Sequence, residues 1–453
     1  MALKKNTEWT LPITGVTQDG QGVGRVDDMV VFTPGCARGD TVRVQIVAVR
    51  ARYAFGRLLA VEQPSPERIP VDCPVFSRCG GCVFRHICYE EELRLKEERV
   101  RDALHRIAKL EIEPEPIVGC EQTLAYRNKA QYPVGWRDGR PVFGFYAPRS
   151  HRIVSAEECL LQPSVFKNVL GAFERWMLEN DVSTYDEQTG KGVLRHVFLR
   201  QAPSTGELMI CAVVNGGAGR LPNREQLIRY CLDAAPQTKS IVLNRNTAHT
   251  NVILGDTCET LWGADRITDV LCGLRFSLSP LSFYQVNSRQ AERLYHAAAE
   301  FADLRKTDVL LDLYCGVGTI GLSMAGAVGR LIGVEVVPDA VADAKRNAAG
   351  NGIENADFFC ADAGEATVRL QQQGLAPDVV VVDPPRKGLD AAAVTAVVQM
   401  APSRVVYISC NPETLARDLT LFAEEGYVCT RLRPYDLFPR TAHVECCALL
   451  VKR

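Results

Sequence analysis

The alternation of apolar and polar positions marks the first 60 or so residues as a set of short strands. Residues 41–49 read T-V-R-V-Q-I-V-A-V, and a glycine-rich turn at 20–24 precedes a short apolar run at 29–32. Short strands separated by glycine turns predict a small β-barrel of the OB type, a fold that binds oligonucleotides. We expect this barrel to span residues 4–63, because prolines follow directly after it.

The next part of the chain, residues 64–285, begins with a helical pattern. Over residues 89–108 the apolar side chains recur at helical spacing among alternating charges, with Leu93, Val100 and Leu104 on one face. From residue 115 to 285 strand and helix patterns mix, and their periodicity does not define a topology. We therefore predict a mixed α+β central region.

From residue 286 onward, strands alternate with helices. Four apolar segments, 309–313, 331–335, 379–383 and 405–409, read as parallel strands buried on both faces. The pattern predicts an α/β doubly wound (Rossmann-like) domain over residues 286–453, in which ligands bind at the carboxyl ends of the strands. Four candidate site residues lie at such ends: Tyr314, Glu335, Asp383 and Cys410.

Composition excludes several classes of protein. The 453 residues are 47% hydrophobic and 23% charged, as in ordinary globular domains. No apolar run approaches the roughly 20 residues of a membrane helix, and the basic start lacks the apolar core of a secretory signal. Seventeen cysteines in such a chain argue for a reducing cytoplasm and against a disulfide scaffold.

Two glycines after the first of these strands suggest a nucleotide-cofactor loop. Gly316 and Gly318 let the backbone approach a ligand, and Glu335 is placed to accept hydrogen bonds from ribose hydroxyls. Gly321 comes one residue too early for the dinucleotide fingerprint, which favours S-adenosylmethionine over a nicotinamide. Asp362 is expected near the adenine. The alternatives are a tight strand-to-helix turn and a solvated loop acid.

The candidate reactive centre is Cys410, within Ser-Cys-Asn-Pro-Glu-Thr. A thiolate is the nucleophilic form of cysteine, and its addition to C6 of a uracil would make C5 nucleophilic toward a sulfonium methyl. A base must then remove the C5 proton. Glu445 fits this role, because its neighbours are apolar and a buried carboxylate is costly unless it is paired or functional. The alternatives are a buried small residue for Cys410 and a surface acid for Glu445.

These motifs resemble those of the RNA uracil-C5 methyltransferase family. The resemblance covers Asp-Pro-Pro-Arg-Lys-Gly at 383–388 and, sixteen residues later, Val-Val-Tyr-Ile-Ser-Cys-Asn-Pro-Glu-Thr at 405–414. It implies that Cys410 is the nucleophile and Glu445 the base. It also implies S-adenosylmethionine contacts from Gln285, Tyr314, Glu335 and Asp383. The chain departs from the family at Tyr435 and Arg440, which bears on substrate contacts and not on the reaction.

Four cysteines form a candidate metal centre: Cys73, Cys79, Cys82 and Cys159. Four thiolates hold either zinc or an iron–sulfur cluster, and the residues alone favour zinc slightly. All four positions resemble ribosomal-RNA members of the family with a TRAM domain and a [4Fe-4S] cluster, so the resemblance implies such a cluster.

A basic segment with interleaved aromatics, residues 126–152, is a candidate RNA surface. Its candidate contacts are Arg127, Lys129, Arg137, Arg149 and Arg152. Aromatic rings stack on unpaired bases while cations hold the backbone, although the same pattern fits core aromatics with a solvated basic face. We expect 23S rRNA, with a flipped uridine, as the partner of a monomeric enzyme.

Two other readings differ in class. Methyltransferases acting on adenine or guanine amino groups use an Asn/Asp-Pro-Pro-aromatic turn, whereas Arg386 follows the prolines here and Cys410 is present. A non-catalytic RNA-binding assembly factor is disfavoured by the intact loop and reactive centre. Transfer RNA remains the alternative substrate, although transfer-RNA members typically lack both the TRAM domain and the four cysteines.

Overall fold

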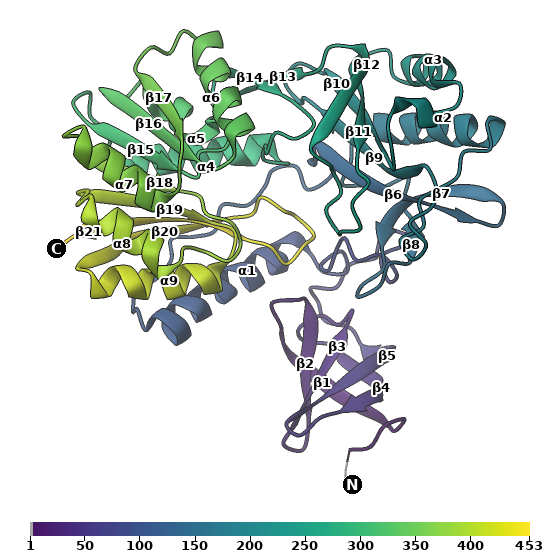
Figure 1. Ribbon diagram of the computed structural model, residues 1–453. Coiled ribbons are helices and arrows are strands. Elements are labelled where there is room, and N and C mark those ends of the chain that lie inside the picture. Colours follow the sequence, from purple (N-terminus) through teal and green to yellow (C-terminus); the bar gives the residue numbers. More distant parts are fainter. Residues whose placement is uncertain (1–2) are drawn as a thin grey trace.

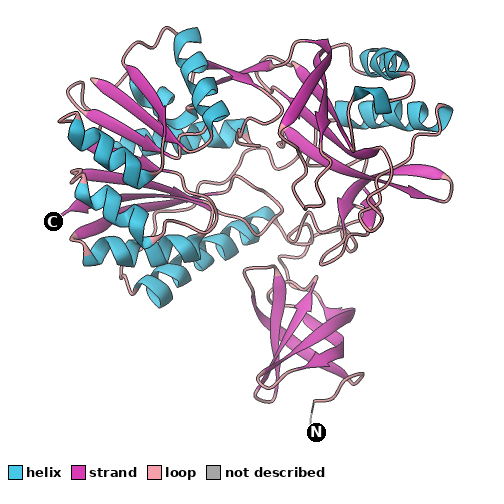
Figure 2. Ribbon diagram, viewed as in Figure 1, coloured by secondary structure: helices cyan, strands magenta, loops and turns pink. Residues whose placement is uncertain are grey.

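The computed structural model describes residues 3–453 and divides into three parts (Figure 1). A small barrel lies at the N-terminus, a second sheet with its own helices forms the centre, and a larger α/β unit contains the C-terminus (Figure 2). No helix in the described range is long and apolar enough to cross a membrane.

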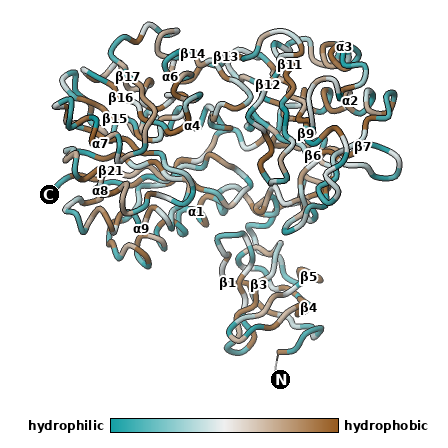
Figure 3. Tube along the Cα trace, in the orientation of Figure 1, coloured by the Kyte–Doolittle hydropathy of each residue, from teal (hydrophilic) through white to brown (hydrophobic). Residues whose placement is uncertain are grey.

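The N-terminal part is a closed five-stranded barrel in the order β1-β2-β3-β5-β4, as the sequence predicted. Burial alternates along β4, where Val42, Val44 and Ile46 are fully buried. Hydrophobic and hydrophilic positions both occur along the barrel strands (Figure 3). Gly24 is required, because a Cβ there would lie 2.0 Å from the Leu11 side chain. The strands are β1 (Glu8–Val16), β2 (Gln21–Val26), β3 (Met29–Pro34), β4 (Thr41–Val49) and β5 (Tyr53–Gln63).

The central part is built on a seven-stranded sheet in the order β12-β11-β10-β9-β6-β7-β8. Helices α2 (Val165–Glu179) and α3 (Arg224–Ala234) cover one face. The strands are β6 (Lys129–Arg137), β7 (Arg140–Tyr146), β8 (Ile153–Ser155), β9 (Leu194–Gln201), β10 (Leu208–Val214), β11 (Thr238–Arg245) and β12 (Thr257–Gly263). Alternate residues of β9 and β10 face the C-terminal part, so both faces of these strands are buried.

The C-terminal part is a seven-stranded sheet in the order β17-β16-β15-β18-β19-β21-β20. The five strands from β15 to β19 are parallel, and β21 runs antiparallel to both its neighbours. The strands are β15 (Val309–Leu313), β16 (Arg330–Glu335), β17 (Ala356–Cys360), β18 (Val379–Val382), β19 (Arg404–Ser409), β20 (Tyr427–Tyr435) and β21 (Glu445–Lys452). The doubly wound prediction is confirmed, with the four predicted strands in place.

Helices cover both faces of this sheet, which explains why its strands are almost wholly apolar. Residues 379 and 381 of β18 pack into one core, and residues 380 and 382 pack into the other. The first face carries α4 (Ser288–Ala302), α5 (Thr319–Ala325) and α6 (Pro338–Gly350). The second carries α7 (Ala363–Gln372), α8 (Ala391–Gln399) and α9 (Pro412–Glu424).

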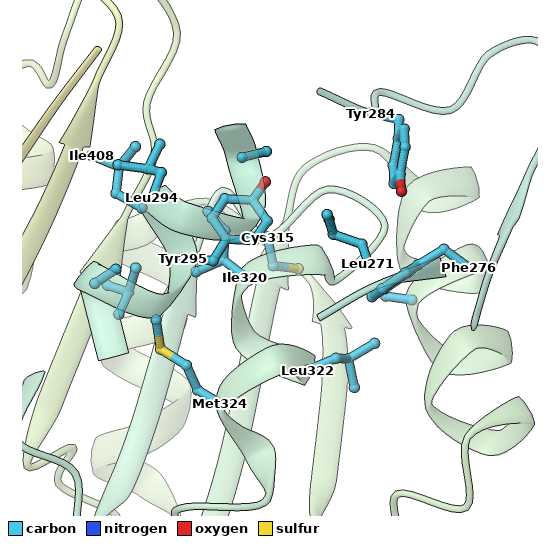
Figure 4. Close-up of a cluster of buried hydrophobic side chains, with 14 of the residues drawn as sticks. Leu271, Phe276, Tyr284, Leu294, Tyr295, Cys315, Ile320, Leu322, Met324 and Ile408 are labelled. Atoms are coloured by element: carbon cyan, nitrogen blue, oxygen red, sulfur yellow. The ribbon is translucent and has the colours of Figure 1, made fainter. Parts of the chain in front are cut away.

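Two elements that precede the α/β unit in sequence pack against it. A hairpin of β13 (Ile267–Leu271) and β14 (Leu274–Leu278) joins the core beneath α4 and α5, where Leu271 and Phe276 lie near Tyr295 (Figure 4). Helix α1 (Tyr89–Ala103), which continues as a π-helical turn (Leu104–Ala108), packs against α9. Arg38 of the barrel pairs with α1 carboxylates at 2.8–2.9 Å and attaches the barrel to this helix.

A buried ion pair network holds α1 in place. The Lys96 ammonium, 1% exposed, donates to Glu92 and to Asp436 at 2.7 Å each, and both carboxylates are fully buried. Removing one member of such a network leaves uncompensated buried charge, which costs about 3–5 kcal/mol.

We expect Lys96→Met to lower the free energy of unfolding by about this amount, because two buried carboxylates lose their counter-ion. The loss should shrink as the pH falls from 8 to 5, since burial raises the pKa of Glu92 to about 7 and its protonation removes one of the unpaired charges. Urea unfolding followed by circular dichroism measures both effects. Lys167→Met, which removes an exposed pair with Glu158, is the control and should cost less than about 1 kcal/mol. Equal losses in the two variants would contradict the prediction.

Candidate active site

The carboxyl edge of the C-terminal sheet gathers the polar residues that the sequence singled out. Tyr314 follows β15, Glu335 ends β16, Asp383 follows β18 and Cys410 follows β19. Because these four strands are consecutive in the sheet, their ends lie side by side. The structure thus brings the candidate cofactor loop and the candidate nucleophile to one edge.

The loop after β15 has a backbone shaped for close approach. Tyr314, Gly316 and Gly318 have φ values of 67°, 55° and 86°, the left-handed region that glycine adopts at no steric cost. The Gly316 amide donates to one oxygen of Glu335 at 3.1 Å, and the other oxygen accepts from the next two amides, at 336 and 337. These bonds fix the carboxylate beside the loop, where ribose hydroxyls bind in related folds.

Asp312, in strand β15 just before this loop, is a residue that the sequence reasoning missed. Its side chain is buried, and one oxygen accepts from the Gly321 amide at 2.8 Å. Burial raises the pKa of Asp312 to about 7, and the nearby carboxylates of Asp383 and Glu335 add to the rise. A Cβ at residue 321 would lie 2.7 Å from this carboxylate, which explains the early glycine. A lone acid inside an apolar strand was the available signal.

Two other predicted cofactor residues have structural contacts. Asp362 is exposed and caps α7, because its carboxylate accepts from the Glu365 amide at 2.9 Å. Gln285 is 9% exposed, and its backbone carbonyl accepts from the Asn128 side chain at 2.8 Å. Gln285 therefore lies where the central sheet meets the α/β unit.

The pairing of β19 with β21 places Cys410 beside Glu445. Ser409 is opposite Cys446 in the antiparallel register, so the next positions on the two strands are neighbours. Glu445 is buried, at 3% exposure, as its apolar neighbours predicted. Burial raises the pKa of Glu445 to about 8, and Asp383 adds to the rise. Burial raises the pKa of Cys410 to about 11, with further contributions from both carboxylates.

Arg386 is the cation that opposes these shifts, because its guanidinium lowers the pKa of both Cys410 and Glu445. Its backbone carbonyl accepts from the side chains of Asn411 and Thr414 at 3.3 Å, which ties the Pro-Pro-Arg turn to the start of α9. Cys410 and Glu445 thus share the charge of one guanidinium. The unbound site can hold a proton on the thiol and donate or accept others near neutral pH.

The four predicted metal-ligating cysteines line one cavity of about 330 Å³. They come from the loop 73–82 and from residue 159, far downstream. In the described residues, no three of their sulfurs lie within 4.8 Å of one another. Tetrahedral zinc with 2.3 Å bonds would place sulfurs about 3.8 Å apart, so this set is more open than a zinc site. Four thiols around such a cavity fit a larger cluster.

The predicted RNA contacts surround the central sheet. Arg137, Arg149 and Arg152 are exposed on the β6–β8 strands and their loops. Arg127 borders both the cysteine cavity and a second cavity of about 360 Å³. Lys129 is partly buried, and desolvation lowers its pKa to about 8, with Arg200 and Arg127 adding to the fall.

The aromatic residues of this segment are divided between core and surface. The rings of Tyr132 and Phe143 are buried in the core of the central sheet, whereas Trp136 is 41% exposed. Tyr132 and Phe143 are therefore core residues, as in the alternative interpretation of this segment.

Comparison with known proteins gives a consistent result. The model of the TRAM domain family matches residues 3–59, and that of the tRNA (Uracil-5-)-methyltransferase family matches residues 272–453. Proteins described as uncharacterized RNA methyltransferases are 42% identical in Halalkalibacterium halodurans and 40% identical in Clostridium tetani. Each alignment covers 99% of this chain and 97–98% of the relative.

One solved structure aligns over the whole length. The Pyrococcus abyssi tRNA (uracil-54, C5)-methyltransferase, in complex with S-adenosyl-L-homocysteine, superposes with a TM-score of 0.79 and 28% identity. The superposition covers 98% of this chain and 99% of that chain. With the five-stranded barrel, the doubly wound sheet and the Cys410–Glu445 pair, these matches show that the chain belongs to the S-adenosylmethionine-dependent RNA (uracil-5-)-methyltransferase family with a TRAM domain.

Proposed function

We propose that this enzyme methylates C5 of a specific uridine in 23S rRNA, with Cys410 as nucleophile and Glu445 as general base. The observation that carries the proposal is the register of β19 and β21, which sets the thiol beside a buried carboxylate. We assign RNA binding to residues 4–63 and 64–285 and catalysis to residues 286–453. The protein acts as a monomer in the cytoplasm.

The proposed chemistry uses these two side chains in sequence. The Cys410 thiolate adds to C6 of the uracil, and the C5=C6 electron pair makes C5 nucleophilic. Bound S-adenosylmethionine supplies the methyl group that C5 receives. The Glu445 carboxylate then takes the C5 proton, the C5=C6 double bond forms again, and the bond from C6 to sulfur breaks. Arg386 favours the ionised forms of both side chains.

We propose that S-adenosylmethionine binds along the carboxyl ends of the parallel strands. The proposed contacts are Gln285, Tyr314, Gly316, Gly318, Glu335, Asp362 and Asp383. The Glu335 carboxylate, held by three backbone amides, is the proposed ribose partner. The capping role of Asp362 leaves its second oxygen for the adenine.

We also propose that Cys73, Cys79, Cys82 and Cys159 hold a [4Fe-4S] cluster, with zinc as the alternative. The open spacing of the sulfurs and the volume of the cavity support the larger group. When bound, the cluster would supply a cross-link between the loop after the barrel and the central region, with no part in methyl transfer.

The RNA is proposed to reach the site between the barrel and α9. A cavity of about 240 Å³ is lined by Gln18 and Asp19 of the barrel and by Asn411 and His443 next to the reactive centre. The proposed RNA contacts of the central region are the arginines at 127, 137, 149 and 152 and Lys129. A folded RNA must release the target base from its stack before that base can enter.

A second candidate substrate is transfer RNA, since the Pyrococcus abyssi relative is a tRNA (uracil-54, C5)-methyltransferase. The four cysteines favour ribosomal RNA by family resemblance. We expect purified enzyme to methylate 23S rRNA, but not tRNA, from a strain that lacks its gene, and mapping 5-methyluridine identifies the position. Methylation of tRNA alone would reverse the assignment.

We expect RNA containing 5-fluorouridine to form a covalent adduct that survives denaturing electrophoresis. Glu445 can remove a proton from C5 but not a fluorine, so the bond from C6 to sulfur would not break. Cys410→Ala should form none, whereas Cys258→Ala, which removes an exposed cysteine on β12 of the central sheet, should behave as wild type. Glu445→Gln should lower kcat by about 10²–10⁴-fold and accumulate the adduct on ordinary RNA. Normal methylation by Cys410→Ala would refute the mechanism.

The buried carboxyl of Glu445 also predicts a pH-dependent stability. Its folded pKa of about 8 exceeds the unfolded value, so the carboxyl destabilises the fold as the pH rises from about 4.5 to 8. Glu445→Gln should therefore raise the free energy of unfolding little at pH 5 and most above pH 8, by up to about 3–5 kcal/mol. Glu424→Gln, exposed on α9, is the control. An equal gain at both pH values would contradict this account.

A further inference from the structure

Three metal-binding side chains converge on a region that the reaction does not use. Cys272 occupies the turn of the β13–β14 hairpin, and Glu292 and His296 lie one helical turn apart on α4. One donor atom from each, a thiol sulfur, a carboxylate oxygen and a ring nitrogen, lies within 4.8 Å of the other two. None of these residues belongs to the four-cysteine cavity or to the carboxyl edge of the sheet.

The donors are held in place but not consumed by other contacts. The backbone amide of Cys272 donates to Oε1 of Glu292 at 2.8 Å, which fixes the carboxylate beneath the hairpin. Within residues 3–453, no side-chain hydrogen bond is found at the Cys272 sulfur, at the second Glu292 oxygen or at the His296 ring. Cys272 and Glu292 are partly buried and His296 is exposed, so the cluster is open to solvent on one side.

The turn itself gives no reason for a cysteine. Cys272 and Gly273 have φ values of 50° and 76°, the backbone of a two-residue turn that favours asparagine, aspartate or glycine at its first position. A cysteine there adopts a costly left-handed conformation. Such a local outlier is a reason to look for a function of the side chain.

We propose that Cys272, Glu292 and His296 bind a zinc ion. Thiolate, imidazole and carboxylate are the donors that zinc prefers, and three protein ligands leave a fourth position for water. One thiolate and one carboxylate neutralise the charge of the ion. The histidine and the glutamate, four residues apart on a helix, have the spacing found in other zinc sites.

A zinc ion here would join the hairpin to α4 beside the cofactor loop. The hairpin amides of Arg275 and Ser277 donate to Asn351 and Asn347 of α6 at 2.8 and 2.9 Å. The Asn347 side chain also donates to the Val317 carbonyl, inside the loop, at 3.0 Å. The hairpin and α4 already share one core (Figure 4), so the three donors are pre-organised and the ion need not reorder the backbone.

The test is metal binding by the full-length protein, with the four-cysteine site intact in every variant. Co²⁺ is titrated in to detect thiolate-to-metal absorption, and Zn²⁺ affinity is measured by competition with a coloured chelator. Loss of residues that only support metal ligands costs about 10–100-fold in affinity, so His296→Gln and Cys272→Ser should weaken one Zn²⁺ site by at least about 100-fold. His105→Gln removes an exposed histidine that lies 3.5 Å from Glu113, with no cysteine in the pair, and is the matched control.

Wild type and His105→Gln should each bind one more Zn²⁺ than His296→Gln and Cys272→Ser. Zn²⁺ should also raise the melting temperatures of wild type and His105→Gln by more than those of the two site variants. Because His296 is exposed, its substitution tests the site without loss of the fold. Equal Zn²⁺ stoichiometry and affinity in wild type and His296→Gln would overturn the proposal. Methylation activity is not the readout, so the failure of this site would leave the proposed reaction untouched.

Discussion

The arrangement of the site depends on the ion pairs that the buried ammonium of Lys96 makes. It bridges Glu92, on the same helix, to Asp436, in the segment that leads to Glu445. All three groups are removed from water, so none can leave without stranding the charge of the others. One turn further along α1, Arg99 pairs with Glu413 at the start of α9, just after Cys410. A single helix from the central region therefore contacts both the segment that leads to Glu445 and the helix that begins just after Cys410.

The site combines this rigid frame with an excess of acidic groups. Asp312 and Glu445 are buried and Asp383 is partly buried; desolvation raises the pKa of all three, and the guanidinium of Arg386 opposes the rise for Glu445. Low solvent exposure makes each proton position sensitive to the charge of its neighbours. The burial that raises these pKa values also destabilises the free protein where the carboxyls are ionised.

The accuracy of the sequence predictions follows the distance over which each interaction acts. The parallel strands were predictable because consecutive residues such as Val380 and Val381, which face opposite sides of the sheet, are both apolar. This pattern is local in the sequence. The central sheet was not, because β6 pairs with β9 across about 60 residues and periodicity carries no information on partners. The bridge from Lys96 to Asp436 spans 340 residues and was also missed. Asp312 was visible in principle, as one acid within an apolar strand.

The placement of β21 has a consequence for how the enzyme acquires its activity. This strand follows β20 in the chain but lies between β19 and β20 in the sheet. Until β21 is paired, β20 has no strand of the main sheet to join, since its only neighbour there is β21. Glu445 is the first residue of β21. The pairing of β21 with β19 and the arrival of the carboxylate beside the thiol are therefore one event.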